Sequence, residues 1–435
     1  QAGVEARVAA SAATDADLDV PGFGLVPRPF QRAGALYALR EKRVIIADEM
    51  GLGKTIEALM VLESARAYPA VVVCPASVKL NWVREARRCL PKRNVVALGP
   101  RPMRYPELYD ILVVNYDVLV DRTTARPQAD PERVADYRRR EGLSLAAAKI
   151  RALAEQGQKD EGPALRADLL RLHPKLRAVV LDEAHYTKNS TALRTRLARK
   201  LAHEVEYRLL LTGTPILNRP EELIPLLQII DRLDDLGGYT KVRNRYAPLD
   251  LSTGRRGAAH LPELHRRLRA LCYVRRRKAE VLAELPPIQY TTVPLEIDNR
   301  AEYESAARDV VAWLQVGVAK DRAFLASIAA LPRAEQAERI RARMQDVAER
   351  ARQAEQLVRL GALKRLAARG KLAAAQEWID TFLESESKLV AFGHHVEVVK
   401  ALAERYRAPS ITGATPAAER QAAVDRFQQD PRCAL

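Results

Sequence analysis

A glycine-rich segment near the start of the chain carries the residue types that bind nucleotide phosphates. An apolar run leads into DEMGLGKT at residues 48–55, and a stretch of helical character follows. Gly51 and Gly53 would let backbone N–H groups close around phosphate oxygens, and the helix start adds partial positive charge. Lys54 would reach the β- and γ-phosphates and the Thr55 hydroxyl would bind Mg²⁺, so ATP and Mg²⁺ are the predicted ligands. The simpler alternative is a strand-turn-helix with two turn glycines.

A pair of acidic residues follows a second apolar run. The run Ala178–Leu181 leads directly into Asp182-Glu183-Ala184-His185. In a parallel sheet the carboxyl ends of neighbouring strands lie at one edge, so both acids are expected beside the phosphate loop. Asp182 is predicted to hold Mg²⁺ through water, and Glu183 to orient and deprotonate an attacking water. A solvated helix start is the alternative for this segment taken alone.

The elements that must position these residues are short apolar runs separated by amphipathic stretches. Such runs, bounded by turn or polar residues, are typical of strands buried on both faces of a parallel sheet. Helical stretches between them predict repeated βα units, and therefore an α/β fold with a doubly wound parallel sheet. The predicted strands are Val44–Ala47, Ala70–Cys74, Val95–Leu98, Ile111–Val114, Ala178–Leu181 and Arg208–Leu211.

Changes in composition divide the chain further. Two segments rich in Ala, Arg, Glu and Gln predict helices, and the run Lys388–Phe392 predicts a strand that restarts the strand–helix alternation. The predicted segments are a tail at 1–25, the ATP-binding α/β domain at 26–231 with a helical insertion at about 124–173, a linking region at 232–295, a helical protrusion at 296–372, and a partial second α/β domain at 373–435.

Composition points to a polyanionic partner. The chain has 435 residues, 48% hydrophobic and 29% charged, with a formal net charge of +16. This excess favours nucleic acid first and an anionic membrane second, although no apolar run approaches the roughly 18 residues of a membrane span. Four cysteines without CxxC spacing favour a reducing compartment over a disulfide framework or a zinc site. The start at Gln1 is not typical of a signal peptide and predicts a fragment or a processed product.

With the phosphate loop and the acidic pair established, the chain resembles the Swi/Snf family of DNA-translocating ATPases in helicase superfamily two. Asp48 departs from the general phosphate-loop pattern, which has Gly there, but matches this family's form. The resemblance covers the chain from about residue 25 and implies a RecA-like lobe 1, an inter-lobe linker and the start of a RecA-like lobe 2. The residues at 219–223 and 392–395 resemble the HepA-related (HARP-like) branch of annealing helicases.

The same resemblance implies roles for individual residues. Gln31 would read the adenine edge, and His185 and Thr214 would couple the ATP state to lobe movement. The segment Arg275–Lys278 resembles the inter-lobe linker, although its residues alone also fit a solvated helix face or a phosphate contact. The implied DNA-binding residues are Pro75, Ser77, Asn115, Tyr116, Thr212, Gly213, His394, Gly413 and Thr415.

Two residue types have simpler interpretations. Trp82, one of three tryptophans, is at helical spacing and fits core packing better than base stacking. His394 and His395 could indicate a metal, but no cysteine or carboxylate lies at ligand spacing, so we interpret them as facing DNA or the lobe interface.

The predicted function is an ATP-dependent DNA translocase that moves along duplex or branched DNA, anneals strands or remodels forks in DNA repair, and ignores sequence. It is expected to be a monomer, in the cytoplasm with the nucleoid if bacterial and in the nucleus if eukaryotic. The alternatives are a strand-separating DEAH-type helicase and a nucleotide-gated DNA-binding module. The family's motifs V and VI, with its arginine finger, would follow Leu435, so a protein ending there should bind ATP and DNA with little DNA-stimulated turnover.

Overall fold

The computed structural model divides the chain into two compact units, unit 1 at Gln1–Pro287 and unit 2 at Ile288–Leu435. Most of the predicted insertion at 124–173 lies outside the described residues. The structure describes residues 2–120, 164–215, 219–250, 256–286, 288–309, 321–329, 331–353, 355–385 and 388–435, with isolated residues between 133 and 151.

A parallel sheet of seven strands forms the centre of unit 1, in the order β3-β4-β2-β5-β6-β1-β7. The six predicted strands are all present, within a residue at their ends, and each pairs in parallel with its neighbours. The doubly wound α/β fold class is therefore confirmed for unit 1. The strands are β1 Arg43–Ile46, β2 Ala70–Cys74, β3 Val95–Ala97, β4 Ile111–Asn115, β5 Ala178–Asp182, β6 Tyr207–Leu211 and β7 Tyr273–Val274.

Helices cover both faces of this sheet, and the strand residues alternate between two apolar cores. On β1, Val44 and Ile46 belong to one core, whereas Ile45 belongs to the other. Strands buried on both faces need near-continuous apolar sequences, which is why these runs could be recognised. One face carries α2 Pro29–Glu41, α3 Lys54–Ser64 and α4 Lys79–Cys89; the other carries α7 Ala167–Leu172, α8 Leu193–Ala202, α9 Leu223–Ile229, α10 Gly238–Tyr246 and α11 Leu261–Leu271.

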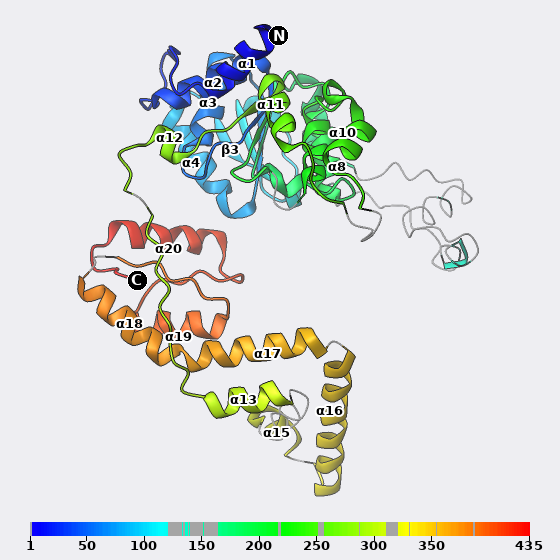
Figure 1. The fold of residues 1–435 in the computed structure, drawn as a ribbon, viewed down its shortest axis with the longest axis vertical. Coiled ribbons are helices and arrows are strands. Elements are labelled where there is room, and N and C mark those ends of the chain that lie inside the picture. Colours follow the sequence, from blue (N-terminus) through cyan, green and yellow to red (C-terminus); the bar gives the residue numbers. More distant parts are fainter. Residues whose placement is uncertain are drawn as a thin grey trace. The chain divides into compact units, whose positions relative to one another are not determined.

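Unit 1 extends beyond both predicted borders of the ATP-binding domain. Part of the segment predicted as a tail forms helix α1 (Ala2–Ala12), which lies beside α2 and α11 (Figure 1). The buried Ser11 hydroxyl donates to the carbonyl of Tyr273 at 2.6 Å. Strand β7 and the short helix α12 (Lys278–Val281) also belong to this unit, although they fall in the predicted linking region. The interpretation of residues 1–25 as a tail is therefore wrong, because α1 packs on the end of the sheet.

Unit 2 is helical in most of its described residues. The segment Lys388–Phe392, predicted as a strand, is extended but not assigned as a strand, and the Leu389 N–H donates to the Ala434 carbonyl at 2.7 Å. The start of a second lobe remains a prediction. Among the described helices of the chain, none combines the length and apolar character of a membrane span. The helices of unit 2 are α13 Arg300–Arg308, α15 Arg322–Ile328, α16 Arg333–Gln353, α17 Glu355–Gly370, α18 Leu372–Ser385, α19 Val396–Tyr406 and α20 Ala417–Gln429.

Candidate nucleotide-binding and catalytic site

The phosphate loop joins β1 to α3 and has a backbone that only glycine adopts easily at two points. Gly51 and Gly53 have φ angles of 88° and 82°, in the left-handed region. A Cβ at Gly53 would lie 2.4 Å from the side-chain nitrogen of Gln31. That Gln31 nitrogen donates to the Leu52 carbonyl at 2.9 Å. Gln31, predicted to read adenine, thus also holds the loop in place.

Lys54 begins helix α3 with its ammonium group inside the loop. Its Nζ donates to the carbonyl of Asp48 at 2.9 Å and to that of Glu49 at 3.4 Å. Burial lowers the pKa of Lys54, while Glu183, Asp48 and Asp182 oppose this shift. An ammonium, the adjoining Thr55 hydroxyl and glycine N–H groups at a helix start are the donors that nucleotide phosphates require, so these residues fit ATP.

Asp182 ends strand β5 and is fixed from two sides. The Trp82 indole N–H donates to its Oδ2 at 2.7 Å, and the Glu183 N–H donates to Oδ1 at 2.9 Å. Burial raises the pKa of Asp182, and the Trp82 hydrogen bond partly offsets that rise. Trp82 is buried in the core, as predicted, but its polar contact with Asp182 was not predicted. A carboxylate held this way keeps one orientation for a cation.

Trp82→Phe is expected to lower ATP turnover about tenfold while the protein stays folded. The phenyl ring retains most of the packing, but a hydrogen bond to a charged group contributes about 1.5–3 kcal/mol, and Asp182 would lose that donor. Steady-state ATPase rates with thermal melts measure both effects. Trp378→Phe, in unit 2, is the control; equal losses in both variants would contradict the assigned role of Trp82.

Glu183 lies just past the end of β5, and its backbone has a φ of 47°. Few non-glycine residues adopt the left-handed region, and those that do are found at active sites more often than elsewhere. The His185 Nδ1 lies 3.2 Å from Glu183 Oε2 and 3.3 Å from Thr212 Oγ1. The Thr214 N–H donates to the same hydroxyl at 3.2 Å. These contacts join Glu183 to the two residues predicted to couple the ATP state to movement.

Several residues predicted to bind DNA lie inside unit 1. Tyr116 is 3% exposed, and its hydroxyl donates to the Asp182 carbonyl at 2.8 Å. Asn115 is 7% exposed and accepts from Lys79 Nζ at 3.2 Å, and Thr212 is fully buried. These three side chains are therefore buried among contacts within unit 1, and DNA contact by them stays a prediction. Pro75 and Gly213 are at least partly buried, Ser77 is exposed, and His394, Gly413 and Thr415 lie in unit 2 with at least partial exposure; DNA contact by these six stays a prediction.

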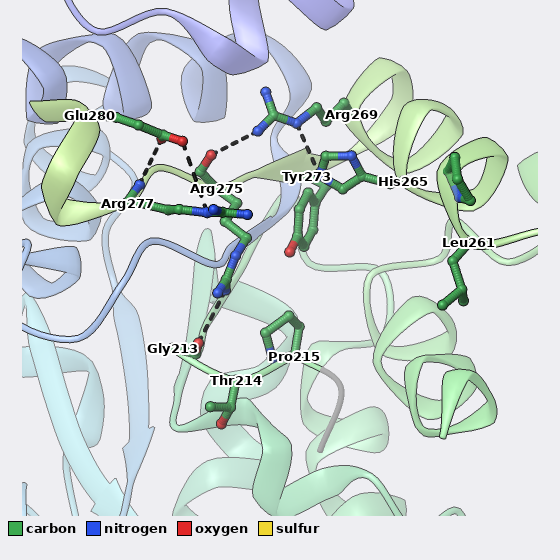
Figure 2. A pocket seen from close by; sticks show the side chains of 11 residues that line it. Gly213, Thr214, Pro215, Leu261, His265, Arg269, Tyr273, Arg275, Arg277 and Glu280 are labelled. Carbon is green, nitrogen blue, oxygen red and sulfur yellow. Dashed lines mark hydrogen bonds and ion pairs between the residues drawn. The ribbon is translucent and has the colours of Figure 1, made fainter. Parts of the chain in front are cut away.

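The segment after β7 runs alongside the phosphate loop. The Arg275 guanidinium donates to the Ala47 carbonyl at 3.0 Å and to the Gly213 carbonyl at 3.2 Å. Arg275 and Gly213 line a pocket of about 550 Å³, together with Arg269 and His265. Figure 2 shows the Arg275 side chain directed toward Gly213. A solvated helix face is therefore the wrong interpretation for Arg275, because its side chain ties the end of β1 to the loop after β6.

Comparison with known proteins identifies the family. The SNF2-related domain matches residues 30–344, so the chain belongs to the SNF2-related family and the predicted Swi/Snf resemblance is confirmed. The mouse protein "DNA annealing helicase and endonuclease ZRANB3" is 26% identical over 417 residues, which are 93% of this chain and 33% of that protein.

A second relative and a solved structure are also similar to this chain. A Xenopus laevis "SWI/SNF-related matrix-associated actin-dependent regulator of chromatin subfamily A-like protein 1" is 27% identical over 92% of this chain and 35% of its own length. The chain thus spans about a third of these curated relatives. The "Sulfolobus solfataricus SWI2/SNF2 ATPase core in complex with dsDNA" aligns at 20% identity with a TM-score of 0.44, covering 96% of this chain and 78% of that one.

Proposed function

We propose that the chain is the motor part of an ATP-dependent DNA translocase. The observation that carries the proposal is that one edge of the sheet brings together a phosphate-loop cation and two carboxylates. Lys54 begins the helix after β1, and Asp182 and Glu183 lie at the end of β5, which is separated from β1 by one strand of the same parallel sheet. A cation that binds the phosphates and a carboxylate base that activates the attacking water are groups that phosphoryl transfer to water uses. The family membership and the names of the relatives support the same conclusion.

The chain's own residues divide the chemistry among them. Lys54 and the loop N–H groups would bind the phosphates, and Gln31, whose side-chain nitrogen donates to the Leu52 carbonyl, is proposed to contact the base. Burial, followed by the charge of Asp182, raises the pKa of Glu183, which makes its carboxylate a better proton acceptor than an exposed one. Thr55 and Asp182 would hold Mg²⁺, which when bound neutralises charge on the phosphates.

The net charge of +16 and the relatives named as DNA annealing helicases support DNA as the track. A motor that grips backbone phosphates moves without regard to sequence. We propose duplex or branched DNA as the substrate, a monomer as the active form, and a location wherever the cell keeps its DNA: the nucleus, or the cytoplasm with the nucleoid in a bacterium.

Three assays on one preparation of the full-length protein test this proposal. ATP turnover is measured with and without duplex DNA, translocation by displacement of a third strand from a triplex, and strand separation on a forked duplex. A translocase hydrolyses ATP faster with DNA and displaces the third strand without separating the fork. Strand separation would favour a DEAH-type helicase instead, and DNA binding without turnover in the full-length protein would favour a nucleotide-gated binding module.

DNA binding is expected to be steeply dependent on salt. With about 6–10 phosphate contacts, affinity should fall by about 10³–10⁵ between 50 and 200 mM salt, because bound cations are released from DNA. Fluorescence anisotropy with two duplexes of unrelated sequence measures both the slope and the indifference to sequence. A flat salt response, or strong selection of one duplex, would contradict a phosphate-tracking motor.

A further inference from the structure

A buried cluster of three ionisable side chains lies beneath the phosphate loop. The Arg276 side chain is 2% exposed, and those of Asp48 and Glu57 are fully buried. The Arg276 Nε lies 3.1 Å from Asp48 Oδ1, and its terminal nitrogen lies 2.8 Å from Glu57 Oε2. The backbone N–H of Arg276 also donates to Asp48 Oδ1, at 2.9 Å. The sequence did not predict this cluster, because the segment Arg275–Lys278 was interpreted as an inter-lobe linker, a solvated helix face or a phosphate contact.

Each partner of Arg276 belongs to a different part of the nucleotide site. Asp48 opens the phosphate loop, and Glu57 lies on the first turn of α3, three residues after Lys54. The remaining guanidinium nitrogen donates to the carbonyl of Phe30, the residue before Gln31 on α2. One guanidinium therefore fastens together the loop, the helix that starts at Lys54 and the helix that carries Gln31.

Gly34 provides independent evidence that this contact is built into the fold. It lies within helix α2, where glycine is unfavourable. A Cβ at Gly34 would lie 2.0 Å from Glu57 Oε2 and 2.3 Å from an Arg276 guanidinium nitrogen. Any larger residue would therefore push α2 away from the cluster.

The electrostatics of the cluster argue against a role in stability alone. Burial, followed by the charge of Asp48, raises the pKa of Glu57 well above its ordinary value. Two buried carboxyl groups thus share one guanidinium, and this crowding of acids favours the protonated form of Glu57. Buried ion pairs are often no more stabilising than apolar side chains of the same volume. A contribution to folding stability is therefore a weak explanation for the presence of the Asp48–Arg276 ion pair. A planar guanidinium with several fixed donors is well suited to set geometry.

The backbone beside Arg276 continues along the loop. The Glu49 N–H donates to the Arg276 carbonyl at 3.0 Å, and the Lys278 N–H donates to Glu49 Oε2 at 2.7 Å. A Cβ at Gly51 would lie 3.4 Å from Lys278 Nζ. The segment after β7 therefore packs along the phosphate loop, and Arg276 is its buried residue.

We propose that Arg276 is a positioning residue for the nucleotide: it sets the relative placement of the phosphate loop, Lys54 and Gln31 without touching ATP. This inference rests on the proposed nucleotide site. It extends the functional part of unit 1 to residues that follow its last strand.

Arg276→Met and Arg166→Met form a matched pair that tests the inference. Arg166 is equally buried, at 2% exposure, in an ion pair with the fully buried Asp168, and it donates to the carbonyls of Gly99 and Arg101, away from the loop. Arg276→Met is expected to weaken the affinity for a fluorescent ATP analogue, and to raise KM for ATP, by about 10–100-fold, because small misplacements of binding groups have effects of this size. Arg166→Met is expected to leave both values at the wild-type level.

A second variant of Arg276 separates loss of charge from loss of geometry. Arg276→Lys retains the charge but cannot reach all three elements, so it should fold and still bind ATP poorly. Wild-type affinity in both Arg276 variants, or the same loss in Arg166→Met at equal thermal stability, would overturn the inference. Absence of ATP binding by the wild type, with correct folding, would instead overturn the proposed nucleotide site.

Discussion

Glu183→Gln is expected to abolish ATP turnover and leave ATP affinity close to that of the wild type. Glutamine retains the shape of the side chain at the end of β5 but cannot accept a proton from water. General-base catalysis contributes about 10²–10⁴-fold, so the rate should fall by that amount. Single-turnover hydrolysis and binding of a fluorescent ATP analogue measure the two quantities separately.

The pH dependence of the wild type provides a second test of Glu183. Its pKa is raised by burial and by Asp182, and the base must be ionised to act. The rate should therefore fall as the pH decreases through that raised pKa, at a higher pH than an exposed glutamate would give. Glu206→Gln, a surface change beside Lys42, should alter neither the rate nor the pH at which the rate falls. Unchanged turnover in Glu183→Gln would contradict the catalytic assignment.

Lys54→Ala is expected to remove most of the ATP affinity. The Lys54 ammonium lies within the loop, and loss of one partner from a buried charge pair costs about 2–5 kcal/mol. That cost corresponds to a loss of about 30-fold or more in affinity. Equilibrium titration with the fluorescent analogue, at constant Mg²⁺, measures it.

Lys79→Ala is the matched control for this variant. Lys79 is also partly buried, its pKa is also lowered by burial, and its ammonium donates to the Leu98 carbonyl at 3.0 Å. Because Lys79 lies away from the phosphate loop, its removal should leave ATP affinity unchanged. A comparable loss in both variants would indicate general damage to unit 1 instead of a lost phosphate contact.

The sequence was sufficient to predict six strands, and to predict that Lys54, Asp182 and Glu183 lie at one edge of the sheet, because both depend on local patterns. Apolar runs such as Val71–Cys74 are continuous because the sheet is covered on both faces. Asp182 ends β5, Glu183 follows it, and Lys54 begins the helix after β1; parallel strands bring their carboxyl ends to one edge. Strand β7 could not be recognised, because it has two residues and is followed by a run of arginines.

The remaining differences come from tertiary contacts that single residues do not reveal. Arginine is usually exposed, so the burial of Arg276 depends on two acids more than 200 positions earlier in the chain. Tyr116 and Trp82 were interpreted from motif position or helical spacing, but both make hydrogen bonds to Asp182. Helix α1 was missed because its sequence is weakly amphipathic and depends on packing against α11.

Strand β7 also has a consequence for how the protein is made. The strand lies beside β1, which leads into the phosphate loop, and the Ser11 hydroxyl on α1 bonds to Tyr273. A ribosome produces the residues of α1 first and those of β7 more than 260 positions later. Until then, β1 has a free edge and Asp48 has no arginine beside it. The nascent chain therefore carries an incomplete nucleotide site, open to pairing with other strands, until residue 276 has emerged.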